Sequence, residues 1–299
     1  MKNYIAQFLK SYAYPVEAEE VILSVYDKLK GNGDFNNLVD RFYADESMDF
    51  KVIKDTLEKI SNIISADFYT VQLVFFICLT PYFKNMYKKA GVDEKIYYDT
   101  VEDLKYKLTE CYDVEKVWGV IPTGWFVNIF RMRTYALGRL EFNMGVHTGD
   151  DLVIGEQAVK NGDKVINIHI PSSGKPFDAA SRLDSYEKAY YFFKDRFGDN
   201  EPVFRCETWL IYPPNRELLG EKSNIVSFME DFNIVSSYEY PDTSNLWRIF
   251  GADAELPPEQ LPRNTSMQRA FADWIIKGNR LGAGIGYFVY DPINKAILK

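Results

Sequence analysis

The apolar residues of this 299-residue chain change their spacing near residue 115, and that change constrains the fold more than any other feature. Before this point they recur every three or four residues, as they do along one face of an α-helix. After it, short segments alternate apolar and polar residues, which is typical of half-buried strands. We therefore expect two domains, a helical N-terminal domain over residues 1–117 and a sheet-containing domain over residues 118–299.

One segment of the helical half differs from the amphipathic stripes around it. Residues 68–86 are apolar on every face of the expected helix, which predicts the buried centre of a helical bundle. Pro81 lies within this segment. Because proline lacks a backbone donor and crowds the preceding turn, we expect the helix to be kinked or split there.

A strand, a helix and a strand follow one another in the second half, at residues 165–170, 183–197 and 203–212. This order favours a parallel pair of strands joined by a right-handed crossover. Asn161-Gly162, between two strand-like segments, predicts a hairpin turn. We expect an α/β (α+β) fold, with an N-terminal helical bundle followed by a mixed β-sheet with flanking helices.

Further along, residues 245–251 are also expected to form a strand. Thr265 and Gln268 are spaced as in a capping box, which predicts the start of a helix. A glycine-rich strand over residues 284–290 is expected to close the chain.

The composition argues against several classes of protein. The formal charge of −8 argues against a nucleic-acid partner, because such proteins neutralise phosphates with clustered Lys and Arg. Three widely spaced cysteines predict buried thiols, and two histidines are too few for a conventional zinc site. The strongest apolar run, residues 71–79, is far shorter than the roughly 18 residues of a membrane span, and no secretory signal is evident. We expect a cytoplasmic protein with a small-molecule substrate and with no metal, nucleic acid or membrane.

Four motifs of the second half carry a family resemblance. They are LGRLEF at 137–142, NIHIP at 167–171 with Gly174, CETWL at 206–210, and SNI at 223–225 with Phe228 and Phe232. With these motifs the chain resembles, over nearly its whole length, the acyltransferase-domain proteins that join a helical N-terminal domain to a GNAT-like C-terminal domain. The resemblance implies acetyl-CoA or another acyl-CoA as co-substrate and an amine as acceptor.

The resemblance also implies where coenzyme A binds. In GNAT enzymes the pantetheine pairs with the splayed end of a strand, and the pyrophosphate rests on amides at the start of the next helix. The matching cofactor-binding positions are Ile170, Ser172, Ser173, Gly174 and Lys175. Asn224 is a further candidate, although Ser223-Asn224 also reads as a helix N-cap.

The loop departs from the GNAT pattern. The usual Gln/Arg-x-x-Gly-x-Gly/Ala sequence is absent, and Pro171 and Pro176 each remove an amide that could bind phosphate. Gly174-Lys175 does not complete a nucleotide-binding P-loop either, because Pro176 follows and the upstream glycine is missing.

Three residues are candidates for catalysis. Glu207 is suited to accept a proton from an amine, or to order a water that does so, and the alternative is a strand carboxylate paired with an arginine. His169 is a second candidate base, and its alternative is a histidine held by neighbouring hydrogen bonds. Tyr212, at the end of its strand, falls near the position from which some GNAT enzymes protonate the departing thiolate.

Three further residues are candidates for substrate binding. Arg139 and Glu141 alternate on one strand face, where they could bind a polar substrate or pair with neighbours. Trp209 follows Glu207 closely and could contact substrate or plug the cleft.

These residues support a hypothesis of direct acyl transfer from acyl-CoA to an amine. The main alternative is a non-catalytic GNAT-like binding or interaction protein that has lost coenzyme A binding. A third alternative is a hydrolase with Glu141 and Glu207 as a carboxylate pair, which requires the two side chains to converge.

Overall fold

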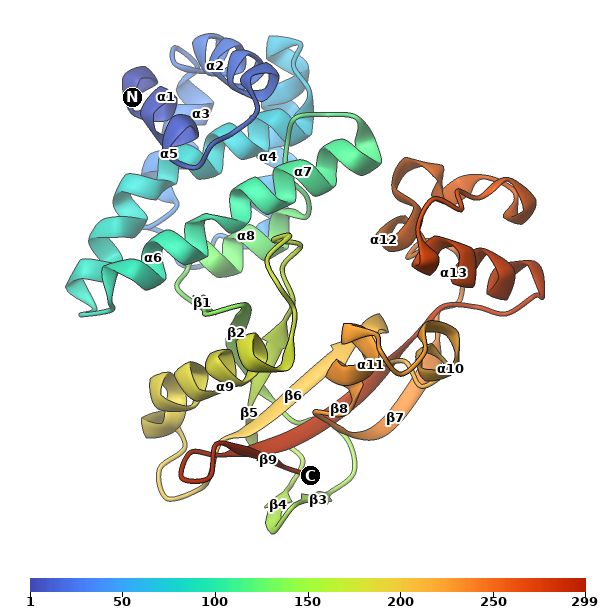
Figure 1. The fold of residues 1–299 in the computed structure, drawn as a ribbon. Helices are drawn as coiled ribbons and strands as arrows, with labels where there is room; N and C mark the ends of the chain where they lie inside the picture. The colour runs from blue at the N-terminus through green and yellow to red at the C-terminus, as the bar shows by residue number, and fades with distance from the viewer. The chain divides into compact units, whose positions relative to one another are not determined.

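The computed structural model describes residues 1–299 and divides into two compact units, Met1–Tyr135 and Ala136–Lys299 (Figure 1). The first unit is helical. Its helices are α1 (Lys2–Ser11), α2 (Val16–Leu29), α3 (Gly33–Arg41), α4 (Phe50–Ile64), α5 (Phe68–Lys89), α6 (Glu94–Val101), α7 (Asp103–Glu115) and α8 (Thr123–Phe130).

Helix α5 is the centre of the helical unit, as its apolar sequence predicts. Every residue from 70 to 80 is buried. Contrary to one form of the prediction, the helix is not split, since it continues through Pro81 to Lys89. No single helix is long and apolar enough to cross a membrane, and only α4 and α5 together, bent by 116°, reach the required length and composition.

The division between the units lies later than the predicted boundary at residues 117/118. The predicted boundary would place α8 in the second domain, although α8 packs against α4 and α5. Phe126 and Phe130 of α8 lie 5.1 and 5.2 Å from the ring of Phe76 in α5. Helix α8 therefore belongs to the helical unit, because its apolar side chains complete the core around α5.

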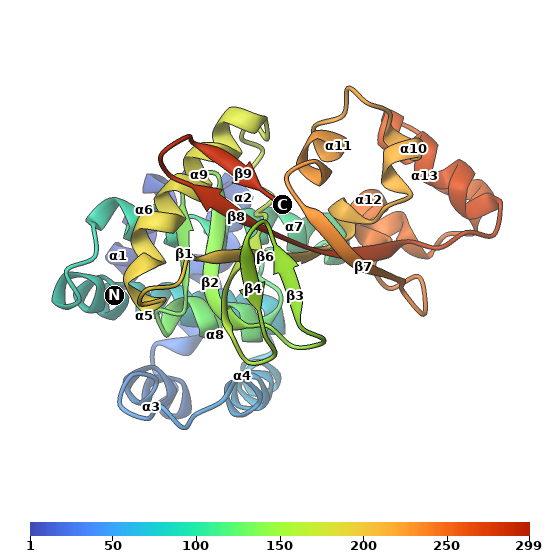
Figure 2. The same cartoon turned by 90° about the horizontal axis from the view of Figure 1, so that it is seen from below.

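The second unit is built on a mixed sheet with the strand order β1-β2-β5-β6-β8-β7, with β9 paired to β8 and a separate β3–β4 hairpin (Figures 1 and 2). The strands are β1 (Thr134–Leu137), β2 (Leu140–Val146), β3 (Leu152–Ile154), β4 (Gln157–Val159), β5 (Lys164–His169), β6 (Val203–Thr208), β7 (Asn233–Glu239), β8 (Gly282–Asp291) and β9 (Ala296–Leu298). The helices are α9 (Ala179–Phe193), α10 (Asn215–Leu219), α11 (Asn224–Met229), α12 (Trp247–Phe250) and α13 (Ser266–Ile276). Helix α9 joins β5 to β6, and these strands are parallel, which confirms the predicted strand–helix–strand unit.

Two local predictions are wrong. Asn161-Gly162 forms a turn, but it does not join paired strands, since β4 pairs with β3 around Gly155. Residues 247–250 form α12 rather than a strand, because Ile249 and Phe250 enter a helical cluster with Phe271 of α13. The capping box of α13 is confirmed, with reciprocal hydrogen bonds between Thr265 and Gln268.

The sheet of the second unit has one strongly apolar face. The rings of Phe204 in β6 and Phe288 in β8 stack at 4.8 Å, and the ring of Tyr186 in α9 lies 4.7 Å from that of Phe288. The β3–β4 hairpin lies on the opposite face (Figure 2). Its Ile154 and Val159 join a smaller apolar cluster there. The apolar face thus anchors α9, whereas part of the other face is left for polar side chains.

The glycines of β8 allow a close approach by the segment that follows β6. A Cβ atom on Gly284 would lie 2.2 Å from the carbonyl oxygen of Ile211, and one on Gly286 would lie 2.7 Å from Cβ of Phe232. The glycine-rich strand expected from the sequence is therefore present, and its lack of side chains permits this packing.

Candidate functional site

The parallel strands β5 and β6 part before either strand ends. Their last paired residues are Asn167 and Arg205, whereas β5 continues to His169 and β6 to Thr208. Elsewhere in the sheet, β6 stays paired with β8 as far as Thr208. The ladder is therefore interrupted at one place, and we call the space between residues 168–170 and 206–208 the strand opening.

His169 and Glu207 flank the strand opening on the same face of the sheet. Asn167 and Arg205 are directly paired, so their side chains share a face. His169 and Glu207 each lie two residues further on and point the same way, because side chains alternate along a strand. The structure thus brings together the two bases predicted from the sequence.

A row of polar residues crosses the same face just below the strand opening. The paired residues of this row are Asn143 of β2, Asn167 of β5, Arg205 of β6 and Tyr287 of β8. His169 is tied to this row, since its Nε2 lies 2.9 Å from Oδ1 of Asn143. Because an amide oxygen only accepts, Nε2 carries the proton, and in the neutral ring the lone pair is on Nδ1.

Glu207 is held by two donors. Nη2 of Arg205 donates to its Oε2 at 2.6 Å, and the hydroxyl of Tyr238 donates to its Oε1 at 2.8 Å. Partial burial acts to raise the pKa of Glu207, but the hydrogen bonds from Tyr238 and Arg205 outweigh it, so the pKa is lowered. The side chain remains 38% exposed, so a ligand can reach it.

Glu141 lies across β5 from Glu207. It is buried, and it is directly paired with His169 across β2 and β5. Its strand and that of Glu207 are separated by two strand spacings, roughly 10 Å. The hydrolase alternative, which requires these two carboxylates to converge, stays a prediction, because His169 lies on the strand between them.

The loop after β5 is folded on itself. The amide of Ser173 donates to the carbonyl oxygen of Pro171 at 2.8 Å, and the amide of Lys175 lies 3.3 Å from the hydroxyl oxygen of Ser173. Gly174 has φ +67°, a left-handed conformation that favours glycine. Two of the amides expected to bind phosphate are therefore used within the loop.

Arg139 holds this loop in place. Its Nη1 donates to the carbonyl oxygen of Pro171 at 3.0 Å, and its Nε lies 3.3 and 3.2 Å from those of Lys175 and Pro176. The sequence predicts a substrate-binding role for Arg139. That role stays a prediction, and in the structure the guanidinium binds the loop carbonyls beside the strand opening.

The first turn of α9 carries a carboxylate. Asp178 is the N-cap of α9, and its Oδ1 accepts from the amide of Ser181 at 2.8 Å. This hydrogen bond and one with the Ser181 side chain lower the pKa of Asp178. A carboxylate here satisfies the helix N-terminus that a pyrophosphate would otherwise use. One turn along, the buried Arg182 pairs with Asp231 at 2.6 Å and anchors α9 to the turn after α11.

Trp209 and Tyr212 follow the end of β6 and pack on other parts of the second unit. Tyr212 packs on Gly282 of β8, and burial and Glu239 of β7 raise its pKa. Trp209 packs against Phe271, 5.9 Å between ring centroids, in the cluster around α12 and α13.

Asn224 is exposed at the start of α11, and Ser223 is the cap of that helix, with its hydroxyl accepting from Ile225. Ile170 and Ser172, the other predicted cofactor-binding positions, border the strand opening and its loop, and both are at least partly exposed.

Arg205, Tyr238 and Tyr287 were not among the candidates predicted from the sequence. The sequence predicts at most an arginine paired with Glu207, although Arg205 lies two residues before Glu207 and so shares its strand face. Tyr238 and Tyr287 come from strands more than 30 residues away along the chain, and no local pattern links them to Glu207.

The cysteines are free and buried, as predicted. Burial raises the pKa of the Cys206 thiol, so this group stays protonated beside the strand opening. The structure contains no group of three or more His, Cys, Asp and Glu side chains that could hold a metal ion.

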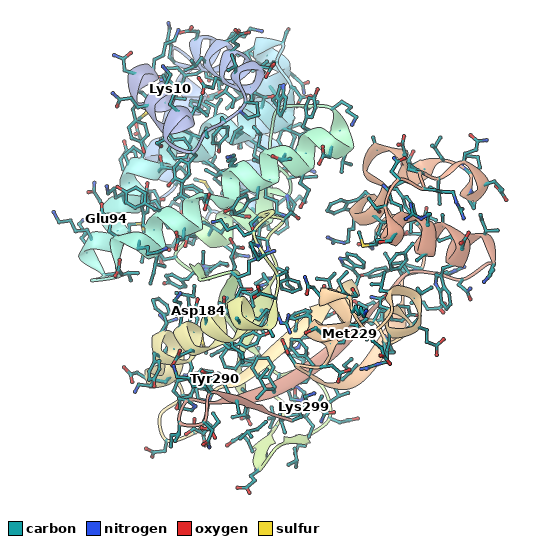
Figure 3. All side chains as sticks on the ribbon, in the orientation of Figure 1. Lys10, Glu94, Asp184, Met229, Tyr290 and Lys299 are labelled. Carbon is teal, nitrogen blue, oxygen red and sulfur yellow. The ribbon has the colours of Figure 1, made fainter.

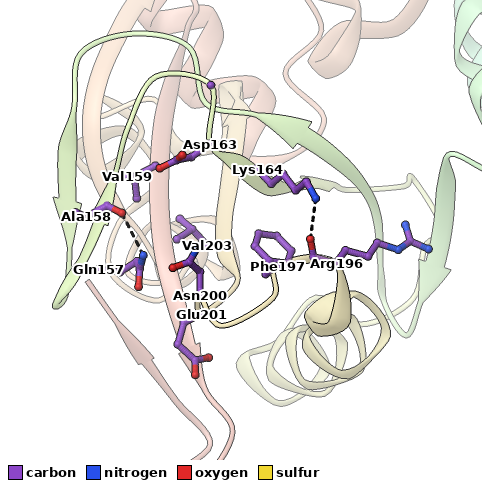
Figure 4. A pocket seen from close by; sticks show the side chains of 11 residues that line it. Gln157, Ala158, Val159, Asp163, Lys164, Arg196, Phe197, Asn200, Glu201 and Val203 are labelled. Carbon is purple, nitrogen blue, oxygen red and sulfur yellow. Dashed lines mark hydrogen bonds between the residues drawn. The ribbon is translucent and has the colours of Figure 1, made fainter.

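A cavity of about 310 Å³ lies at the other end of β5 and β6 (Figure 4). Lys164 and Val203, the first residues of the two strands, line it together with Arg196 and Glu201. Nζ of Lys164 donates to the carbonyl oxygen of Arg196 at 2.9 Å. This cavity is separate from the strand opening, which lies at the carboxyl ends of the same strands.

A helical unit followed by a mixed sheet with parted parallel strands defines a two-domain acyltransferase-like protein. Residues 3–132 match the N-acyltransferase N-terminal domain, and residues 134–288 match the GNAT-like C-terminal domain. The chain therefore belongs to the family that joins these two domains, which confirms the family resemblance. A comparison with curated proteins finds no match.

Solved structures share this fold at low sequence identity. An acyltransferase in complex with decanoyl-CoA and teicoplanin is 18% identical over 95% of this chain and 86% of that chain, with a TM-score of 0.73. A mutant acyltransferase in complex with octanoyl-CoA is 17% identical over 94% and 86%, with a TM-score of 0.72. An acyltransferase in complex with decanoyl-CoA is 21% identical over 72% of this chain, with a TM-score of 0.61, and this match spans 64% of that chain, less than two thirds. At these identities the likeness shows the fold alone.

Proposed function

We propose that this protein is an acyl-CoA-dependent N-acyltransferase that transfers the acyl group directly to an amine. The observation that carries the proposal is the strand opening, where the ladder between β5 and β6 ends at Asn167 and Arg205 with His169 and Glu207 beyond it on one face. Family membership and the decanoyl-CoA and octanoyl-CoA complexes of proteins with this fold support an acyl-CoA as donor.

In the proposed reaction the thioester lies in the strand opening with its carbonyl near the backbone of residues 169 and 170. The amine nitrogen attacks the thioester carbon, a C–N bond forms, and the C–S bond breaks to release the thiolate of coenzyme A. Binding both substrates side by side removes the entropy cost of their encounter, and backbone amides at the strand end stabilise the oxyanion. Water protonates the thiolate, because the ring of Tyr212 packs against Gly282 of β8.

Glu207 and His169 have different parts in this proposal. The lowered pKa of Glu207 makes it a weak base, so we assign to it the binding and orientation of the amine. His169 accepts the proton that the nitrogen loses on attack, because a neutral imidazole is suited to general-base catalysis. The acceptor is a small amine, and its structure is left open.

The loop after β5 favours a second candidate, a non-catalytic binding protein with the same fold. Pro171 and Pro176 lack amides, the amide of Ser173 is used within the loop, and Asp178 places a carboxylate at the start of α9. These features weaken the expected contact with pyrophosphate. The two candidates differ in whether an acyl-CoA is consumed.

Release of free thiol from decanoyl-CoA and octanoyl-CoA in the presence of a panel of primary amines tests the proposal. We expect amine-dependent thiol release with an equal amount of amide product by mass spectrometry. His169→Gln and Glu207→Gln should each reduce kcat/KM by about 10²–10⁴-fold, the usual contribution of a positioned acid or base. Absence of acyl-CoA binding together with absence of turnover for any amine would favour the non-catalytic candidate.

A further inference from the structure

A chain of hydrogen bonds runs from Glu207 into the interior of the second unit. Arg205 donates from Nη2 to Glu207 and from Nε to the hydroxyl oxygen of Tyr287 at 3.2 Å. The hydroxyl of Tyr287 lies 3.0 Å from Nδ1 of His147, and Nε2 of His147 lies 2.9 Å from the carbonyl oxygen of Asp150. We call His147, Tyr287 and Arg205 the support chain of Glu207.

The direction of each hydrogen bond in the support chain follows from chemistry. The carbonyl oxygen of Asp150 can only accept, so Nε2 of His147 carries a proton. In the neutral ring Nδ1 then accepts from the hydroxyl of Tyr287. The oxygen of Tyr287 is therefore turned toward Arg205, whose Nε–H can only donate. Every link is satisfied in one arrangement.

The support chain is rigid at its inner end. His147 and Tyr287 are each 2% exposed. The backbone of His147 is fixed twice, since its amide donates to the carbonyl oxygen of Asp163 at 2.7 Å and its own carbonyl accepts from Gly162 at 2.9 Å. Side-chain exposure rises along the support chain to 19% for Arg205 and 38% for Glu207. The support chain thus links the buried, backbone-fixed His147 to Glu207 at the strand opening.

The surroundings of Tyr287 and His147 do not require polar groups for packing. Tyr287 shares a cluster with Val165, Val203 and Val289, whose side chains are apolar. A buried hydrogen-bonded network is seldom more stabilising than apolar side chains of the same volume. What the network provides is a single orientation for Arg205, a long side chain that otherwise has many rotamers.

Resting on the proposed function, we propose that His147, Tyr287 and Arg205 are positioning residues that hold the Glu207 carboxylate in one orientation for the acceptor amine. Arg205 fixes one carboxylate oxygen and Tyr238 the other. A carboxylate has about four lone-pair sites, so two remain for the amine. Loss of the Tyr287 hydroxyl frees Arg205 and lets Glu207 turn away.

The test is the titration of Glu207 by carbon NMR of the full chain labelled at the glutamate carboxyl carbons, with Glu207→Gln to identify the signal. Tyr287→Phe and His147→Phe should raise the pKa of Glu207 by about one unit, the lower end of the effect of a fixed neighbouring cation. His147→Asn should leave it near the wild-type value, because its side-chain oxygen can replace Nδ1 as acceptor.

Tyr290→Phe is the matched control. Tyr290 lies in the same strand three residues on, on the opposite face, with its ring 6.1 Å from that of Tyr190 (Figure 3). This variant should not move the Glu207 signal. If Tyr287→Phe and His147→Phe leave the pKa of Glu207 unchanged, or if Tyr290→Phe shifts it equally, the support chain has no positioning role.

Arg205→Lys covers the case in which Tyr287→Phe does not fold. Lysine keeps the charge but cannot donate to Tyr287 and Glu207 in the planar arrangement of a guanidinium, so the pKa of Glu207 should again rise. An unchanged value in this variant overturns the proposal. None of these titrations needs an acyl-CoA, so absence of acyl transfer would reject the proposed function without being mistaken for failure of the support chain.

Discussion

The carboxyl group of Asp103 is buried in the helical unit, an environment that disfavours its ionised form. Asp103 begins α7, is completely buried, and accepts from Nε1 of Trp125 at 2.6 Å on Oδ2, while Oδ1 has no hydrogen-bond partner. Burial raises its pKa to about 6, against smaller opposing effects of Lys107 and Trp125, and Glu110 adds to the rise. These effects predict that ionised Asp103 lowers the free energy of unfolding of the helical unit at neutral pH.

The magnitude follows from linkage. The rise from 3.8 to about 6 is roughly two pKa units, and each unit corresponds to about 1.4 kcal/mol, so the ionised form destabilises the fold by about 3 kcal/mol. Below pH 4 the carboxyl is protonated in both the folded and unfolded states, and no cost arises. The cost develops as the pH rises from about 4 to about 6 and is complete above that range.

The perturbation is Asp103→Asn, which cannot ionise and keeps an oxygen for Trp125. We expect the free energy of unfolding of the variant, relative to wild type, to increase by about 2 kcal/mol between pH 4.5 and pH 7.5. Urea unfolding followed by Trp fluorescence and circular dichroism over this pH range measures the difference. Asp113→Asn, an exposed site on the same helix, is the matched control and should show no such increase. Parallel pH curves for wild type and Asp103→Asn would refute the reasoning.

Further predictions concern the second unit. Arg182→Ala leaves the carboxylate of Asp231 without its buried partner and should lower the free energy of unfolding by about 3–5 kcal/mol in urea titrations. Gly284→Ala places a Cβ against the carbonyl of Ile211 and should cost about 1–3 kcal/mol in the same assay. Asp178→Asn keeps the helix cap but removes a charge at the start of α9, so it should lower the Kd of coenzyme A at low ionic strength, measured by calorimetry.

Each of these variants has a control. Arg216→Ala breaks an exposed ion pair with Glu230 and should cost less than about 1 kcal/mol. Gly33→Ala adds a Cβ with nothing within 4 Å and should be nearly neutral. Asp184→Asn removes a charge further along α9 and should not change coenzyme A affinity. A control with the same effect as its variant would contradict the corresponding assignment.

Local patterns predicted the parts of the fold that depend on neighbours in sequence. The apolar spacing of α5 and the capping box of α13 rest on residues within or next to one helix, and the strand–helix–strand unit around α9 rests on the order of three consecutive elements. Residues 245–251 failed as a strand because their apolar side chains enter a cluster with α13, which no local period reports. Asn161-Gly162 forms a turn, but only Gly162 has a positive φ, of +92°, and β4 pairs with β3 instead of the strand after the turn.

The site could be predicted only in part for the same reason. The alternation of side-chain direction along β5 and β6 was enough to select His169 and Glu207. The order of the strands predicted that the two residues lie near each other. The contact of Tyr287 with His147 joins residues 140 positions apart, and that of Arg205 with Tyr287 joins residues 82 apart. Such contacts depend on register across strands, which the sequence of one strand does not contain.

Calorimetric titration of the full chain with decanoyl-CoA tests the central claim most directly, because acyl transfer at the strand opening requires that the donor bind. We expect saturable binding with one site per chain, retained in Glu207→Gln, since that residue is assigned to the amine and not to the donor. Absence of binding heat at about 1 mM decanoyl-CoA, where even a ligand held by about 4 kcal/mol would bind, would contradict the claim.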